Sequence, residues 1–226
     1  MNLLALETST RMGSIALLSD GRLISEYQTG IRPNYSEMLL PLIEQVVNAS
    51  GTSIEAIDMF AVAQGPGSFT ALRIGMSVIL GLSIATDKKI VPVPSLDGLA
   101  YNAYCSNHLI CPMIDARRGE IYYAFYRFED RGRLQRITPY RVASPDRVMS
   151  EIDETVVLLG DGIAMYRDRF VGSLGEKACI APGHLHYPRA SAIGAIAMQR
   201  MSDFPDAAAH ETIVPLYVRP ADAEAK

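Results

Sequence analysis

Residues Gly65 to Gly75 read GPGSFTALRIG and directly follow an apolar run, Met59–Ala63. Glycine and proline allow a chain to turn sharply, so this order predicts a strand, a tight turn and then a helix. From Ala71 to Ala85 the expected helix carries a single charge, Arg73. A helix at a protein surface normally has a polar face, and this one has none to offer to water. The sequence therefore predicts either a helix buried in a large core, or one that packs on its own sheet and leaves its other face to a partner.

The glycine-rich turn itself allows two interpretations. Backbone amides at a helix N-terminus bind anions, so the turn could hold a phosphate. A phosphate loop of the Walker type, however, ends in Gly-Lys-Ser/Thr, and no lysine lies near Thr70. The favoured interpretation is structural: the glycines permit the turn, and Ser68 or Thr70 caps the helix.

Composition narrows the classes of function. The chain has 226 residues with a net charge of −4, which argues against nucleic-acid binding through the field of the chain as a whole. No signal peptide is expected, because Glu7 interrupts the short apolar start, and no apolar run reaches the length of a membrane span. Three cysteines without a CxxC pair fit a reducing compartment. We expect a cytoplasmic protein that does not associate with membranes.

The order of elements before residue 105 predicts the first domain, residues 1–104. Three strands (residues 2–7, 14–18 and 23–27) form a meander, and a helix over residues 36–48 follows, with Ser36 as its N-cap. The strand at residues 59–63, the opening stretch and a strand at residues 90–93 continue an alternation of strands and helices. This order is typical of a mixed sheet covered by helices.

A second domain, residues 105–226, starts like the first. Met113–Asp115 is an apolar run that ends in an acid and returns after a tight turn, as the run ending in Glu7 does. This predicts an internal duplication. Further elements are a strand at residues 121–128, short strands at residues 156–159 and 178–181, and a helix at residues 190–201. Residues 190–226 are a candidate to pack back on the first domain, and residues 221–226 are expected to be disordered.

Glu7 and Asp115 are the candidates for metal chemistry, since paired acids at strand ends can hold Mg²⁺ around a phosphate. Such a site needs a glycine two residues after each acid, and these positions are Ser9 and Arg117. The histidines lack metal-ligand spacing, and no GxSxG nucleophile motif occurs. We therefore expect no catalytic residue and no metal ligand in this chain, and any nucleotide site at Glu7, Thr8, Ser9 and Asp115 to be vestigial.

Several motifs, in order, resemble the bacterial TsaB (YeaZ) family across nearly the whole chain. The run at residues 65–75 is the most specific of them. The others are Glu7–Thr10 with Ser14–Leu17, Tyr35–Glu37 with Leu40-Pro41, Ile114–Tyr122, and Pro215–Arg219. Three positions depart from the family pattern: Glu7 stands for the usual Asp, Tyr35 for a His and Ala71 for a Gly.

The resemblance implies the α/β fold of the actin-like ATPase and sugar-kinase superfamily, with two ribonuclease-H-like halves. It implies a role in threonylcarbamoylation of adenosine 37 in tRNAs that read codons starting with A. Proteins of this kind are not the catalyst: they pair with a TsaD-like transferase that holds the metal, a TsaE-like ATPase joins the complex, and tRNA is reached only through the complex. ATP or ADP is thus expected on the partners, and no cofactor on this chain.

In the family the partner surface uses the helices over residues 36–48 and 70–85, the second of which lacks a polar face here. The predicted interface residues are Met38, Leu39, Leu42, Ile43, Val46, Arg73, Met76, Ser77, Leu80 and Gly81. A homodimer through the same helices is compatible with this prediction. The alternative is a weak autonomous ATPase of the actin-like class; a protease, which older family names suggest, has no nucleophile–base or metal pair to support it.

Overall fold

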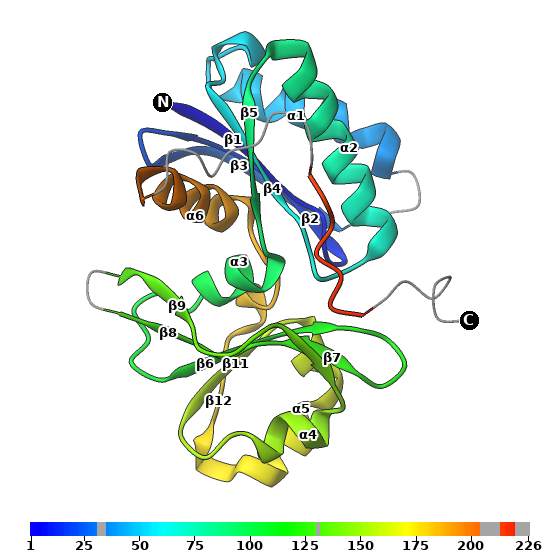
Figure 1. Ribbon diagram of the computed structural model, residues 1–226, viewed down its shortest axis with the longest axis vertical. Helices are drawn as coiled ribbons and strands as arrows, with labels where there is room; N and C mark the ends of the chain where they lie inside the picture. The colour runs from blue at the N-terminus through cyan, green and yellow to red at the C-terminus, as the bar shows by residue number, and fades with distance from the viewer. Residues whose placement is uncertain (31–34, 130–131, 204–212, 220–226) are drawn as a thin grey trace. The chain divides into compact units, whose positions relative to one another are not determined.

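The computed structural model describes residues 1–30, 35–129, 132–203 and 213–219. It divides into two compact units (Figure 1). Unit 1 comprises Met1–Gly98 and Pro188–Leu216, and unit 2 comprises Leu99–Tyr187 and the C-terminal residues from Tyr217. The units therefore divide the chain after Gly98 rather than after residue 104, and each is described by itself.

Unit 1 is built on a mixed five-stranded sheet of order β3-β2-β1-β4-β5. β1 and β3 run antiparallel to β2, while β4 is parallel to both β1 and β5. The strands are β1 (Asn2–Glu7), β2 (Met12–Ser19), β3 (Arg22–Gly30), β4 (Met59–Ala63) and β5 (Lys89–Val93). β1 and β4 are buried almost throughout, as expected for central strands with helices on both faces.

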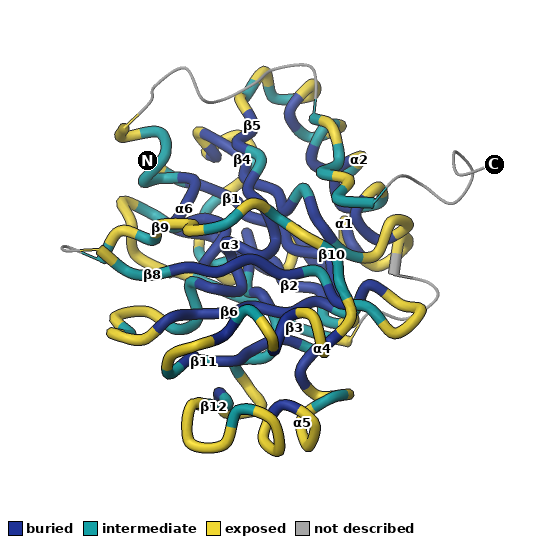
Figure 2. The backbone as a smooth tube through the Cα atoms, turned by 60° about the horizontal axis from the view of Figure 1, so that its bottom comes forward, coloured by how far each residue is buried: buried dark blue, intermediate teal, exposed yellow. Residues whose placement is uncertain are grey.

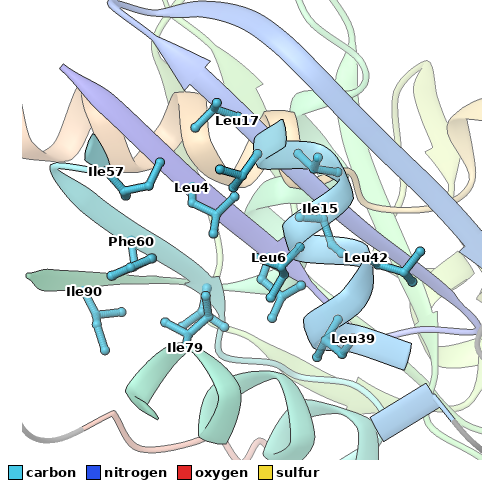
Figure 3. Close-up of a cluster of buried hydrophobic side chains, with 14 of the residues drawn as sticks. Leu4, Leu6, Ile15, Leu17, Leu39, Leu42, Ile57, Phe60, Ile79 and Ile90 are labelled. Atoms are coloured by element: carbon cyan, nitrogen blue, oxygen red, sulfur yellow. The ribbon is translucent and has the colours of Figure 1, made fainter. Parts of the chain in front are cut away.

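Alternation along β1 assigns its side chains to two layers. Leu4 and Leu6 belong to the core formed with α1 (Tyr35–Ala49) and α2 (Phe69–Thr86), which Figure 3 shows. Leu3 and Ala5 point the other way, toward α6 (Ala190–Asp203), where Gly194 lets the helix approach them closely. The sheet of unit 1 thus lies between α1 and α2 on one face and α6 on the other (Figure 1). A short 3-10 turn, Ile54–Ala56, precedes β4, and α3 (Ser95–Tyr101) follows β5.

Unit 2 repeats this topology. Its main path has the order β10-β7-β6-β11-β12, with β7 antiparallel to β6 and β10, and β11 parallel to β6 and β12. The strands are β6 (Leu109–Asp115), β7 (Ile121–Tyr123), β8 (Tyr126–Phe128), β9 (Leu134–Arg136), β10 (Arg141–Ala143), β11 (Val156–Leu159) and β12 (Ala178–Ile180). β8 pairs with β6 and with β9. The helices are α4 (Pro145–Ser150) and α5 (Asp161–Leu174), with 3-10 turns at Gly175–Lys177 and Gly183–Leu185.

The predicted duplication is therefore confirmed at the level of strand order and direction. Each half has a central strand that ends in an acid, Glu7 or Asp115, an antiparallel neighbour on one side and two parallel strands on the other. This is the α/β architecture predicted from the sequence.

Most predicted elements are present, with shifted ends. The strands at residues 59–63 and 156–159 have the predicted bounds. The first predicted helix starts at Tyr35, so Ser36 lies inside it and is not its N-cap. The predicted strand over residues 121–128 is interrupted and forms β7 and β8. The tail at residues 221–226 lies outside the described residues.

Candidate functional site

The opening stretch forms the start of α2, which has two different faces. Its inner face packs on the sheet of unit 1 and holds the buried residues Ala71, Leu72, Gly75, Met76, Ile79 and Ser83. Ser68 occupies the N-cap position, but its side chain makes no capping hydrogen bond; its carbonyl accepts the Leu72 N–H instead. The turn and the helix thus form as predicted, without the predicted side-chain cap.

The outer face of α2 is exposed and almost uncharged. Ile84 is 71% exposed and Phe69 39%, and Gly81 and Ala85 are exposed beside them. Arg73 is the only charged residue of the helix, and its guanidinium lies 3.8 Å from the centre of the Phe69 ring. Of the two predictions for this helix, the structure supports the second: one face packs on the sheet, and the other is apolar surface.

By length and composition alone, α2 could also cross a membrane. It has 18 residues and a mean hydropathy of 1.6. The apolar helix is thus longer than the sequence analysis expects, where no apolar run reaches the length of a membrane span. A third of it is buried inside the protein, against the sheet of unit 1. Helices in the core of a globular fold can have the same length and hydropathy.

α1 packs beside α2 and turns its own apolar stripe inward. The stripe comprises Leu39, Leu42, Ile43, Val46 and Val47, all buried in the core of unit 1. Figure 3 labels Leu39 and Leu42 of this stripe. Met38, 41% exposed, and Leu40, 53% exposed, flank this buried stripe on opposite edges, because residues two apart in a helix lie about 200° apart around its axis. The side chain of Tyr35, one of the departures from the family pattern, lies outside the described residues.

This burial corrects the predicted interface. Five of its ten residues are core residues whose side chains pack inside unit 1, so they offer no surface to a partner: Leu39, Leu42, Ile43, Val46 and Met76. Met38, Arg73, Ser77 and Gly81 are exposed, and Leu80 is half-buried. Ile84 and Leu40 are not among the predicted interface residues, yet they are the most exposed large aliphatic residues of the two helices. We call the six residues that share the exposed side of α2 the outer helix face: Phe69, Arg73, Ser77, Leu80, Gly81 and Ile84.

The turn after β1 fixes the start of α2. The Thr8 hydroxyl donates to the Ala71 carbonyl at 2.9 Å, and the Ser9 carbonyl accepts the Ser68 N–H at 2.7 Å. A Cβ added to Gly67 or to Gly75 would collide with this turn, at Ser9 and at Thr8 respectively. The glycines of the opening stretch are therefore needed for the close approach of the helix to the turn.

Glu7 lies beneath this turn and is fully buried. One carboxyl oxygen, Oε1, accepts the Ser9 N–H, whereas Oε2 is buried without a hydrogen-bond partner among the described residues. Burial raises the pKa of the Glu7 carboxyl to about 7, against the hydrogen bonding with Ser9, which lowers it. Glu7 is therefore placed inside the packed unit rather than displayed at its surface.

Asp115, the equivalent acid of unit 2, is engaged by its own turn. Its Oδ1 accepts the Arg117 N–H at 2.8 Å, its Oδ2 lies 3.3 Å from Arg117 Nη1, and its N–H donates to Asp161 Oδ1 at 3.0 Å. Arg117 has a φ of 62°, a backbone region where glycine is usual. The arginine thus stands where a metal–phosphate site would need a glycine, and its side chain pairs with the acid.

Metal ligands do not gather in the described part of the chain: no group of three or more His, Cys, Asp or Glu could hold an ion there. Among the histidines, His186 serves the packing of unit 2, because its Nδ1 accepts the Gly160 N–H at 3.1 Å. Burial, with the nearby Arg167, lowers the pKa of His186.

Known proteins resemble the chain along its whole length. A protein from Bacillus subtilis, "tRNA threonylcarbamoyladenosine biosynthesis protein TsaB", is 32% identical over 100% of this chain and 97% of its own length. The chain belongs to the TsaB family. A family model described as "TsaD: tRNA N6-adenosine threonylcarbamoyltransferase" also matches residues 16–226, so TsaB and TsaD sequences are related. The motifs quoted from the sequence had indicated this family.

Solved structures agree with this assignment. "YeaZ from Pseudomonas aeruginosa" superposes with a TM-score of 0.82 at 28% identity, over 96% of this chain and 99% of that one. At 10% identity, "Activator of the 2-Hydroxyisocaproyl-CoA Dehydratase from Clostridium difficile with bound ADPNP" has a TM-score of 0.54 over 94% of this chain and 100% of that one. This second likeness shows the fold alone.

Proposed function

We propose that this chain is a non-catalytic subunit in threonylcarbamoyladenosine biosynthesis, and that it binds a TsaD-like transferase through the outer helix face. The family is named for this biosynthesis, which supports the pathway. The observation that carries the proposed role is the outer side of α2, with a single charge and Ile84 71% exposed. Contiguous apolar surface of this kind marks protein interaction sites.

The composition of the outer helix face suits helix-to-helix packing. Ser77 and Gly81 are small and exposed, and an added Cβ on Gly81 would meet nothing within 4 Å. Small residues at such positions let a partner helix come close, while Phe69 and Ile84 supply apolar area. A stable pair would bury about 800 Å² on each partner.

The two acids support a role without catalysis. Glu7 is buried under the turn with its unpaired Oε2 shut off from solvent, and Asp115 is paired with Arg117, so neither carboxylate is displayed at the surface for an ion. Under this proposal the TsaD-like partner holds the metal and transfers the group, and a TsaE-like ATPase supplies ATP hydrolysis. The complex would work in the cytoplasm, and this chain would need no cofactor of its own.

Gel filtration of the purified chain with and without a TsaD-like protein tests the proposal. We expect a 1:1 complex at micromolar concentration, and a homodimer of the isolated chain, if one forms, that dissociates when the partner is added. Two separate peaks would refute the proposed pairing. Steady ATP turnover by the isolated chain that disappears in Asp115→Ala would support the alternative, an autonomous ATPase.

A further inference from the structure

A second surface feature lies in unit 2, on the hairpin formed by β8 and β9. Phe128 on β8 packs edge-to-face with Tyr104, with ring centres 5.3 Å apart, and Tyr101 lies 5.6 Å from Tyr104 and 5.9 Å from Phe128. A Cβ on Gly132, in the β8–β9 connection, would collide with the Tyr104 ring. Tyr104 is nevertheless 55% exposed. The aromatic cluster thus holds the Tyr104 ring in place and leaves this one ring exposed, whereas Tyr101 and Phe128 are half-buried.

The pairing of β8 with β9 places an arginine on the same face as this cluster. Phe128 is paired with Leu134 and Tyr126 with Arg136, so these four side chains share one face of the hairpin. On this face Tyr126 is fully buried, Phe128 and Leu134 are half-buried, and Arg136 is exposed. The Arg136 guanidinium lies 3.9 Å from the centre of the Tyr140 ring. Among the residues that the structure describes, Arg136 forms no ion pair. In the described part of the chain β9 pairs with β8 alone, and it is largely exposed (Figure 2).

Charge is distributed unevenly around this hairpin. From Tyr126 to Arg141 the sequence holds five arginines and two acids, although the whole chain has a net charge of −4. Arg127 and Glu129 belong to the face opposite Phe128, because neighbouring residues of a strand alternate. Arg127 is also neutralised there, by an ion pair with Glu154. Arg141 is likewise paired, with Glu151. Of the arginines on β8 and β9, Arg136 alone shares the aromatic face, and no described acid lies on that face of these two strands.

We propose that this face of the β8–β9 hairpin, formed by Tyr104, Phe128, Leu134 and Arg136, binds single-stranded RNA. Exposed aromatic rings stack on unpaired bases, and arginine neutralises phosphate or stacks in turn; the combination is typical of proteins that bind RNA loops. The proposal rests on the proposed function, in which the substrate of the complex is a tRNA. It adds a direct contact between this chain and an unpaired loop of the tRNA, whereas the family resemblance implies that this chain reaches tRNA only through the complex.

Fluorescence anisotropy on the full-length chain tests this contact. The probes are a labelled anticodon stem–loop from a tRNA that reads codons starting with A, and a blunt RNA duplex of equal length. We expect Tyr104→Ala to weaken stem–loop binding roughly tenfold, as loss of one stacked base does. Arg136→Ala should weaken it and lower the salt dependence, by about 0.7 in the log–log slope for one phosphate contact on a single strand.

Two matched variants separate this contact from general basic charge. Tyr104→Phe keeps the ring and should bind like the wild type. Arg127→Ala removes an arginine from the opposite face of the same hairpin and should leave the affinity within twofold. Tyr104→Ala removes the ring packing with Tyr101 and Phe128, so some fall in the melting temperature is expected, and binding is compared well below that temperature. If that variant does not fold, the comparison of Arg136→Ala with Arg127→Ala decides.

Three results would overturn the proposal: no stem–loop binding by the wild type at tens of micromolar, equal loss in Arg127→Ala and Arg136→Ala, or equal affinity for duplex and stem–loop. Gel filtration of the same variants with the TsaD-like protein is run in parallel. Normal pairing with unaltered RNA binding would reject the RNA contact and leave the proposed function standing. Loss of pairing in the wild type, with RNA binding intact, would reject the proposed function instead.

Discussion

Ile84→Glu is the substitution that tests the outer helix face most directly. In the isolated chain this side chain is 71% exposed, so a glutamate there stays in water. The free energy of unfolding should change by less than about 0.5 kcal/mol, as for other surface substitutions. If a partner covers the face, however, the same carboxylate loses its water and has no counter-ion from α2 except Arg73.

The size of the effect follows from the exposed fraction. Complete burial of an isoleucine contributes about 1.5–3 kcal/mol, so covering the 71% that is exposed contributes about 1–2 kcal/mol. Ile84→Ala should therefore raise the dissociation constant by roughly 5- to 30-fold. Ile84→Glu adds the cost of a buried unpaired charge, about 3 kcal/mol or more, which would abolish pairing at micromolar concentration.

Isothermal titration calorimetry against the TsaD-like protein measures both variants. Met165→Glu is the control, because Met165 is 60% exposed on α5 of unit 2 and lies outside the outer helix face. It should bind like the wild type. If Ile84→Glu binds the partner with unchanged affinity and normal heat, α2 is not the interface and the reasoning from its exposed face fails.

Three further predictions concern the packing of unit 1. Leu39→Ala should lower the free energy of unfolding by about 2–5 kcal/mol in urea titrations, whereas Leu40→Ala, next in sequence and exposed, should change it by less than about 0.5 kcal/mol. Gly75→Ala should destabilise by about 1–3 kcal/mol because its Cβ would collide with the turn after β1, while Gly81→Ala, with open space around it, should be neutral or stabilising by up to about 1 kcal/mol; differential scanning calorimetry compares the two. Burial raises the pKa of Glu7 from 4.5 to about 7, so the folded state holds this proton more tightly than the unfolded state does. The wild type should therefore lose up to about 3 kcal/mol of stability relative to Glu7→Gln as the pH rises from 4.5 to 7. Urea titrations of both proteins at pH 5 and pH 7.5 measure this loss, and the same difference in free energy of unfolding at the two pH values would contradict it.

The sequence was a good guide to the fold because the fold depends on local signals. The apolar run Met59–Ala63 is a central strand between parallel neighbours, and its pattern is readable without tertiary information. α5, Asp161–Leu174, was not predicted. The glycines at positions 160, 162 and 172 are typical of loops rather than of a helix. Only Gly162, Ile163 and Phe170 of this helix are buried, so the helical periodicity of its apolar residues is weak.

The candidate site was harder to predict than the fold. An apolar stripe on α1 identifies a face that is covered, but the sequence does not state whether its own sheet or a partner covers it. The structure assigns Leu39 to the core and Leu40 to the surface. Apolar side chains that stay exposed in the folded chain, such as Leu40 and Ile84, are the better signal for an interface. They can be identified only when the packing is known.

The turn after β1 connects the buried acid to the outer helix face. Glu7 accepts the Ser9 N–H, and the Ser9 carbonyl in turn accepts the Ser68 N–H at the start of α2. A phosphate at this helix start would need free amides, and the Ser68 amide is already taken by the turn. At Gly67 and Gly75, the space that a Cβ would need is occupied by Ser9 and Thr8 respectively. A glycine-rich turn that could approach a ligand is therefore used here to hold α2 rigidly on the sheet, and rigidity lowers the conformational cost of docking a partner on its other side.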